Sequence, residues 1–205
     1  MQLFPFLKGL GLGFLIAAPV GPIGLLCIRR TLAEGRTSGL LTGLGAASAD
    51  AFYGAVAAFG LTALSHFLVG QQLLIRLVGG VFLCYLGLRT LTAPVQPAPP
   101  DRQARTAPAA FVSTFFLTLT NPMTIISFAA VFAGLGIGAR GDDYLAAVLL
   151  VAGVFLGSAA WWFLLSGGVS LLRTRFNATG MQWVNRIAGI LILLFGVVAI
   201  LAAIR

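Results

Sequence analysis

The sequence predicts an all-α, polytopic membrane protein with six transmembrane helices arranged as an inverted 3+3 repeat. Three observations support this fold class: the composition is too apolar for a water-facing surface, the charged residues divide the chain into apolar stretches of spanning length, and the two halves of the chain resemble each other. Of the 205 residues, 59% are hydrophobic and 9% are charged, whereas a soluble domain carries about 25% charged residues. The expected solvent is therefore the bilayer.

The net charge of +8 does not indicate a nucleic-acid partner, because the 13 basic residues are scattered between apolar stretches. Cys27 and Cys84 lie within apolar runs and show no metal-ligand spacing, so we interpret both as small hydrophobic residues. The apolar run that follows Lys8 continues past Ala17-Ala18, so no cleavage site for a signal peptide stands out. These features exclude a nucleic-acid module, a secreted disulfide scaffold and a disordered regulator.

Six stretches have about the 20 mainly apolar residues that a spanning helix needs. The third is the shortest, since only twelve residues separate Arg76 from Arg89, and it must extend back toward Phe67 with Arg76 near an interface. The predicted spans are Gly9–Ile28, Gly39–Leu64, Phe67–Arg89, Ala109–Gly136, Tyr144–Leu172 and Ile187–Ile204. A proline-rich cytoplasmic loop, 93–108, separates a first three-helix repeat, 1–92, from a second, 109–205.

The lysines and arginines predict how the chain is oriented. If the spans alternate in direction, nine basic residues fall on one side and four on the other. Cytoplasmic loops carry the excess of Lys and Arg, so the side with nine is expected in the cytoplasm and both termini outside. The nine are Arg29, Arg30, Arg36, Arg89, Arg102, Arg105, Arg173, Arg175 and Arg186, and the four are Lys8, Arg76, Arg140 and Arg205.

An internal repeat relates the two halves. An offset of 100 residues carries Gly21-Pro22 onto Asn121-Pro122, and ten extra residues then change the offset to 110. At 110, the matches are Gly43, Ser48 and Ala49 with Gly153, Ser158 and Ala159, Phe52-Tyr53 with Trp162-Phe163, and Arg76 through Gly79 with Arg186 through Gly189. Since each half has three spans, an odd number, the second half is expected to be inverted relative to the first. Small residues recur in all membrane helices, but the matched proline and R-x-x-G are more specific.

Asp50 is the most informative residue, because it lies near the middle of the second predicted span. An ionised carboxylate there costs at least about 2.5–3.5 kcal/mol on insertion scales. The other four acids, Glu34, Asp101, Asp142 and Asp143, are expected in loops. We interpret Asp50 as a proton carrier or a counter-ion for a substrate amine; the structural alternative is a hydrogen bond to Ser48, Thr42 or a backbone carbonyl.

The prolines at the aligned positions are the next candidates. Pro19, Gly21 and Pro22 interrupt the first span, and Asn121-Pro122 interrupts the fourth. A proline inside a helix removes one backbone hydrogen bond, and broken helices at equivalent places in two repeats are typical of a transporter's substrate site. The alternative is a kink that only aids packing.

Aromatic and glycine residues have plainer interpretations. Tyr53, Trp161 and Trp162 either belong to an interfacial belt or line the pocket. The glycine pairs at Gly9, Gly39 and Gly153, each with a second glycine four residues later, indicate close helix packing. Hydrolase, metalloprotease and Walker motifs are absent from the sequence, so we expect neither catalysis nor a cofactor.

The chain resembles the LysE/RhtB family of bacterial inner-membrane amino-acid exporters. The residues that carry the likeness are Gly13 through Pro22, Arg30 through Gly35, Gly39 through Asp50, and Leu119 through Pro122. The resemblance implies export of an amino acid or small metabolite, driven by the proton gradient, with Pro19, Gly21, Pro22, Asp50, Asn121 and Pro122 at the family's positions. Many members have a lysine at the place of Met123, and some exporters of basic amino acids have an acid at the place of Ser127.

The leading hypothesis is thus a proton-coupled secondary exporter, an antiporter whose substrate is an amino acid or analogue bound at the proline-interrupted spans. Its candidate substrate- and proton-binding residues are Asp50, Asn121, Pro19, Gly21, Pro22, Pro122, Ser48 and Tyr53. The expected partners are that substrate and the lipid bilayer, with no nucleic acid and with a homo-oligomer left open. The competing hypotheses are a non-transporting membrane scaffold or assembly factor, and a metal-ion exporter, for which the chain has few ligands.

The orientation can be tested with reporter fusions. We expect a fusion at Pro97 to report a cytoplasmic location and one at Arg205 an external location, because an odd number of spans separates the two positions. The measurement is the ratio of an alkaline phosphatase signal to a fluorescent-protein signal at each site. Equal ratios at the two sites would contradict the six-span topology.

Overall fold

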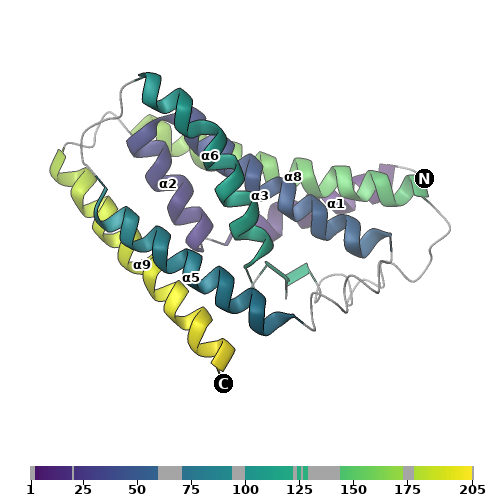
Figure 1. The fold of residues 1–205 in the computed structure, drawn as a ribbon. Helices are drawn as coiled ribbons and strands as arrows, with labels where there is room; N and C mark the ends of the chain where they lie inside the picture. Colours follow the sequence, from purple (N-terminus) through teal and green to yellow (C-terminus); the bar gives the residue numbers. More distant parts are fainter. Residues whose placement is uncertain are drawn as a thin grey trace.

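The computed structural model describes residues 3–19, 21–59, 71–93, 100–121, 124–125, 127–128, 144–172 and 178–204. Within these ranges the chain forms helices and no strand, which confirms the prediction of an all-helical fold for the described residues (Figure 1). The helices are α1 (Leu3–Ala17), α2 (Pro22–Glu34), α3 (Arg36–Ala58), α5 (Gln72–Leu91), α6 (Pro100–Leu119), α8 (Tyr144–Leu172) and α9 (Ala178–Ile204).

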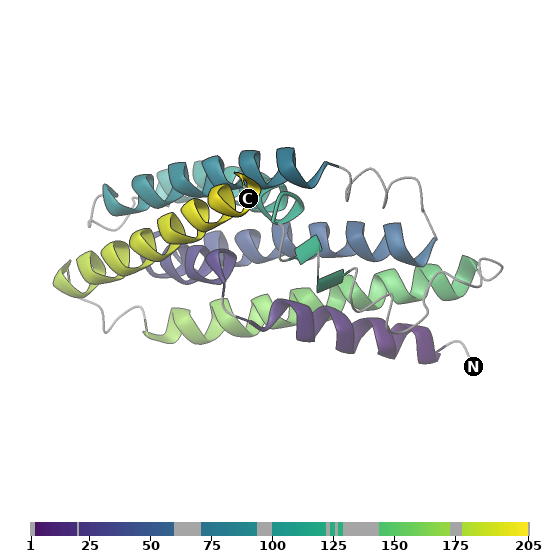
Figure 2. The ribbon, with the colours of Figure 1, turned by 90° about the horizontal axis from the view of Figure 1, so that it is seen from below.

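Long helices pack in pairs around α3. Helix α1 lies along α8, and α5 lies along α9. Figure 2 shows the α1–α8 pair on one side of the molecule and the α5–α9 pair on the other, with α3 between them. Helix α3 contacts α8 and α6, and α2 contacts α3, α8 and α9. The two helices α3 and α8 therefore connect most of the others.

The first predicted span is divided into two helices. Helix α1 ends at Ala17, and α2 begins at Pro22, where Gly21 is the N-cap residue. Proline suits this first helical position. A backbone N–H here would have no partner within the helix, so its absence costs nothing, and the φ of proline is already helical. The axes of α1 and α2 differ by 80°, so the chain changes direction at this point.

Helix α2 is followed directly by α3 through the single residue Gly35. Its φ of 98° lies in the region that favours glycine, and its N–H donates to the carbonyl of Thr31 at 3.1 Å. A side chain here would strain the turn. Gly35 therefore allows α3 to begin at Arg36 and to pack against α2.

Several helix boundaries differ from those predicted. Tyr144–Leu172 is confirmed as one helix, but α6 begins at Pro100, inside the predicted proline-rich loop, and α9 begins at Ala178 rather than Ile187. Helix α5 begins at Gln72, and the predicted extension toward Phe67 lies outside the described residues, as do 122–123, 126 and 129–136 of the fourth span. Hydropathy missed the start of α6 because its first turn carries proline and charged residues, which resemble a loop. It missed the start of α9 because the polar residues Asn185 and Arg186 interrupt the apolar run of that helix.

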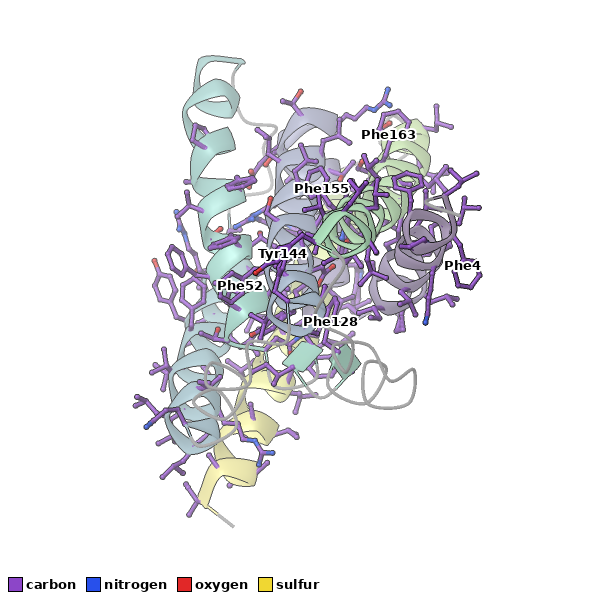
Figure 3. The ribbon with its side chains drawn as sticks, turned by 90° about the vertical axis from the view of Figure 1, so that its right-hand side faces the viewer. Phe4, Phe52, Phe128, Tyr144, Phe155 and Phe163 are labelled. Atoms are coloured by element: carbon purple, nitrogen blue, oxygen red, sulfur yellow. The ribbon has the colours of Figure 1, made fainter. Side chains whose placement is uncertain are left out.

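Four helices, α3, α5, α8 and α9, are long and apolar enough to cross a membrane, and the bent pair α1–α2 meets the same test as a fifth span. Their outward faces carry large apolar side chains, Phe4 of α1 among them (Figure 3). A surface of this kind is stable against lipid but not against water. The chain is a multi-pass membrane protein.

Glycines set the contact between α1 and α8, which confirms the predicted close packing and identifies the two helices that meet. A Cβ on Gly9 or Gly13 would meet the backbone carbonyls of α8, and a Cβ on Gly153 or Gly157 would meet those of α1. By contrast, a Cβ on Gly11 would meet nothing within 4 Å. Helix association in a membrane depends on such close packing, because lipid tails compete with any apolar side chain.

The α1–α8 contact can be tested with matched alanine substitutions. We expect Gly13→Ala to destabilise the protein by about 1–3 kcal/mol, the range for overpacking a tight contact. Gly11→Ala should be neutral or slightly stabilising, since alanine is the better helix former. Thermal unfolding of the two variants in the same detergent measures the difference, and equal melting temperatures would contradict the close approach of the two backbones.

Candidate functional site

Asp50 lies on the face of α3 that packs against α8. The residue is 4% exposed, and the Ser158 hydroxyl donates to its carboxylate Oδ2 at 2.7 Å. The indole Nε1 of Trp162, one turn further along α8, donates to the Ser158 Oγ at 3.2 Å. The buried carboxyl therefore belongs to a hydrogen-bonded chain that crosses from α3 to α8.

Small residues allow α8 to approach Asp50. Positions 43, 47, 50 and 54 of α3 are spaced by four, three and four residues, so they share one helix face. On that face, Gly43 leaves room for the Trp162 side chain and Gly54 contacts Val154, while Ala47 is fully buried. Larger side chains here would separate the helices and leave the carboxyl without its hydroxyl donor.

Asp50 has a hydroxyl partner, and no cation pairs with it in the part of the chain that the structure describes. Within the described ranges, the one ion pair joins Arg29 to Glu34, with 3.2 Å between Nη1 and Oε1. A buried carboxylate without a counter-charge is costly, whereas a protonated carboxyl can still share a hydrogen bond with a hydroxyl. The Asp50 carboxyl can therefore gain or lose a proton without breaking an ion pair.

Tyr53 connects α3 to the end of α6. Its ring is buried, and its hydroxyl donates to the carbonyl oxygen of Leu119, the last residue of α6. The backbone turns immediately afterwards, where the N–H of Asn121 donates to the carbonyl of Thr118 at 3.2 Å and the Asn121 carbonyl accepts from the N–H of Ile125 at 3.2 Å. Hydrogen bonds therefore link Asp50 of α3 to α8 and Tyr53 of α3 to α6.

The other predicted site residues lie apart from Asp50 or beyond the described part. The Ser48 hydroxyl donates to the Leu44 carbonyl of its own helix at 2.8 Å and not to Asp50. Pro19 is exposed, whereas Pro22 is buried at the start of α2. Asn121 is half-buried after α6, and Pro122 lies outside the described residues.

Arg30 is a buried polar residue that the sequence pattern assigns to a cytoplasmic loop. That assignment is wrong, because Arg29 and Arg30 both lie inside α2, and Arg30 is 9% exposed. Its Nη1 donates to Thr42 Oγ1 at 3.1 Å, Thr114 Oγ1 at 3.0 Å and the Ala110 carbonyl at 3.1 Å, and its Nη2 donates to Ser113 Oγ at 3.0 Å. The signal available in the sequence was the hydroxyl residues within the apolar stretches of α3 and of the second half of α6.

Arg29 belongs to a neighbouring set of contacts. It pairs with Glu34 and also donates to the Asn185 Oδ1 of α9 at 3.2 Å. Ser38 donates to the second Glu34 oxygen at 2.7 Å. Glu34, expected in a loop, is instead the last residue of α2. These contacts hold α2 against α3 and α9.

Metal-ligand clusters are not found in the described ranges, where no three His, Cys, Asp or Glu side chains come together. Cys27 is buried in the core and its thiol donates to the Gly39 carbonyl at 3.5 Å. Cys84 is free and half-buried.

The apolar outer faces, with polar side chains buried between helices, are compatible with a membrane transport protein. The chain belongs to the LysE type translocator family, whose profile matches residues 14–203, and the resemblance seen in the sequence is confirmed. It is 29% identical over 198 residues to "Putative amino acid efflux protein YcgF" of Bacillus subtilis (strain 168), covering 93% of this chain and 92% of that protein. It is 33% identical over 172 residues to "Uncharacterized membrane protein YahN" of Escherichia coli (strain K12), covering 82% and 76%. No solved structure matches the chain.

The two serines matched by the repeat provide a test of the Asp50 contact. We expect Ser158→Ala to destabilise the protein by about 1–3 kcal/mol, because it leaves a buried carboxyl without its hydroxyl donor. Ser48→Ala is the matched control and should have little effect, since that hydroxyl bonds only within its own helix. Thermal unfolding in detergent compares the two. A loss of stability in the Ser48 variant as large as that in the Ser158 variant would contradict the site.

Proposed function

We propose that the protein is a secondary active exporter of an amino acid or related small metabolite across the bacterial inner membrane, coupled to protons through Asp50. The observation that carries this proposal is the Asp50 carboxyl, buried between α3 and α8 beside the Ser158 hydroxyl and paired with no cation among the described residues. An ionisable group inside a membrane protein is costly and marks function by default. The family membership and the name of the Bacillus subtilis relative support the same function.

The packing of the helices supports an inverted 3+3 repeat. The sequence offsets carry α1 onto α6 and α3 onto α8. Under that exchange, the contact between α1 and α8 becomes the contact between α6 and α3, and both contacts are present. The α5–α9 pair is carried onto itself. A pseudo-two-fold relation of this kind is the basis of alternating access in many secondary transporters.

The substrate would bind where the helices are interrupted. Gly21 and Pro22 mark the interruption between α1 and α2, and Asn121 follows the end of α6. Tyr53 lies against this second interruption, one turn beyond Asp50 on α3. The roles we assign are binding of substrate polar groups at these interruptions, and loading and release of a proton at Asp50 as the substrate leaves.

A neutral amino acid is the substrate class that we favour. The chain has Ser127 where some exporters of basic amino acids carry an acid, and Met123 where many members of the family carry a lysine. Asp50 is then the one acid available near the interruptions among the described residues. A small unrelated amphiphile is the substrate that a screen must also include.

A membrane scaffold and a metal-ion exporter remain the competing functions. A scaffold gives no physical reason to bury a carboxyl at a helix contact. A metal-ion exporter needs several clustered ligands around its substrate. A toxicity screen of an expressing strain against amino acids, analogues and metal salts separates the three functions, since only an exporter protects the cells from its own substrate.

The coupling role of Asp50 predicts that Asp50→Asn abolishes net efflux while the protein remains folded. An amide has nearly the same shape and can still bond to Ser158, but it cannot carry a proton. Efflux of the amino acid identified by the screen, measured in cells, should fall to the level of cells that lack the protein. Asp50→Glu is the control and should retain part of the activity.

Folding of both variants is checked by size-exclusion chromatography in detergent. Proton-driven efflux by a folded Asp50→Asn variant at the normal rate would end the assignment of Asp50 as the coupling residue.

A further inference from the structure

We infer that Arg30 binds the carboxylate of the exported amino acid at the end of α2, before the substrate reaches the level of Asp50. This inference rests on the proposed function and names the group that would recognise the substrate's acid. Arg30 belongs to α2, and its guanidinium reaches between α3 and α6. There it contacts three hydroxyls and one carbonyl.

The two neighbouring arginines both feel the charge of Glu34 but differ in the groups that they contact. Arg29 is in contact with a carboxylate, that of Glu34. Arg30 is more deeply buried, yet its four hydrogen-bond acceptors are all uncharged. Glu34 acts on its charge only without direct contact, since no ion pair to Arg30 occurs in the described part of the chain. A buried charge is normally paired. Arg30 is therefore a buried cation whose contact partners do not neutralise it.

A carboxylate would be a stronger ligand for this guanidinium than the hydroxyls. Arginine presents its donors in a planar fork that matches the two oxygens of a carboxylate, and charge-assisted hydrogen bonds are roughly twice as strong as neutral ones. The hydroxyls of Thr42, Ser113 and Thr114 can rotate and bond elsewhere. Thr114 already shows such a bond, since its hydroxyl also donates to the Ala110 carbonyl at 2.8 Å.

The position of Arg30 makes this a separate site from Asp50. Its ligand Thr42 and Asp50 both lie on α3, eight residues apart, which corresponds to about 12 Å along a helix. The amine and carboxylate of one amino acid are much closer together than that. The substrate would therefore meet the two residues in turn, first Arg30 on the side with the excess of basic residues, where the cytoplasm is expected.

Replacement of the hydroxyls around Arg30 by the substrate carboxylate would also connect substrate binding to movement of the helices. The Arg30 contacts hold α2 to α3 and α6, so a carboxylate that takes over the guanidinium would release the hydroxyls of the other two helices. A ligand shifts a conformational equilibrium only through such differential contacts. The competing interpretation is that Arg30 is a structural cross-link and never meets substrate.

Carboxylate selectivity tests the inference. The probes are L-alanine, L-leucine, L-threonine and L-phenylalanine, each compared with its carboxamide, which has the same side chain and no carboxylate. Binding is measured as the concentration of each probe that is needed to raise the melting temperature of the purified protein. We expect the wild type to prefer at least one amino acid to its amide by about 30-fold or more, and Arg30→Gln to lose most of that preference.

The controls separate a structural role from a binding role. Arg36→Gln removes one positive charge from an exposed position of α3 and should leave the preference unchanged. Arg30→Lys keeps the charge without the planar fork and should show an intermediate preference; if the glutamine variant does not fold, an unchanged preference in Arg30→Lys overturns the inference. A folded Arg30→Gln variant that keeps the full preference overturns it as well.

The outcomes also distinguish this inference from the proposed function. A wild-type protein that binds none of the amino acids contradicts the proposed substrate class together with the inference. A wild-type protein that binds amino acids and amides equally well contradicts the inference alone.

Discussion

The contact between α3 and α8 is the constraint on which the rest of the structure depends. No water is available in the bilayer core, so a polar side chain there must find its partner within the protein. Asp50 and Ser158 meet because glycines on α3 let the two helices approach. Helix α1 packs against α8, and α6 packs against α3. The two helices that bury the Asp50 carboxyl therefore also contact α1 and α6, the two helices that end at an interruption.

Two polar centres result, and they differ in kind. Around Asp50, the hydrogen bonds are few and run between two helices, which suits a group whose charge must change. Around Arg29 and Arg30, hydrogen bonds join α2 to α3, α6 and α9, which suits a contact that holds helices together until a stronger ligand arrives. Along α3, Ser38 and Thr42 belong to the second centre and Asp50 to the first, so one helix connects the two.

The sequence predicted features that follow from composition and local spacing. The all-helical fold, the burial of Asp50 and the close packing at the paired glycines needed only hydropathy and the repeat of small residues. That the glycines of α1 face those of α8 was not predicted. The partner of Asp50 was not predictable in this way, because Ser158 lies 108 positions away and helical periodicity does not say which faces meet. Arg30 was misassigned because counting basic residues assumes that they lie outside the helices, whereas long side chains can be buried when neighbouring helices offer acceptors.

The proposal that a substrate leaves as protons enter is tested most directly by measuring both fluxes in one experiment. Proteoliposomes holding the purified wild-type protein are loaded with the amino acid that the toxicity screen identifies, together with a pH-sensitive dye, and then diluted into amino-acid-free buffer. We expect exit of the amino acid to acidify the interior, with Asp50→Asn liposomes showing neither flux. Exit of the amino acid at the wild-type rate with no change of internal pH would contradict coupling through Asp50.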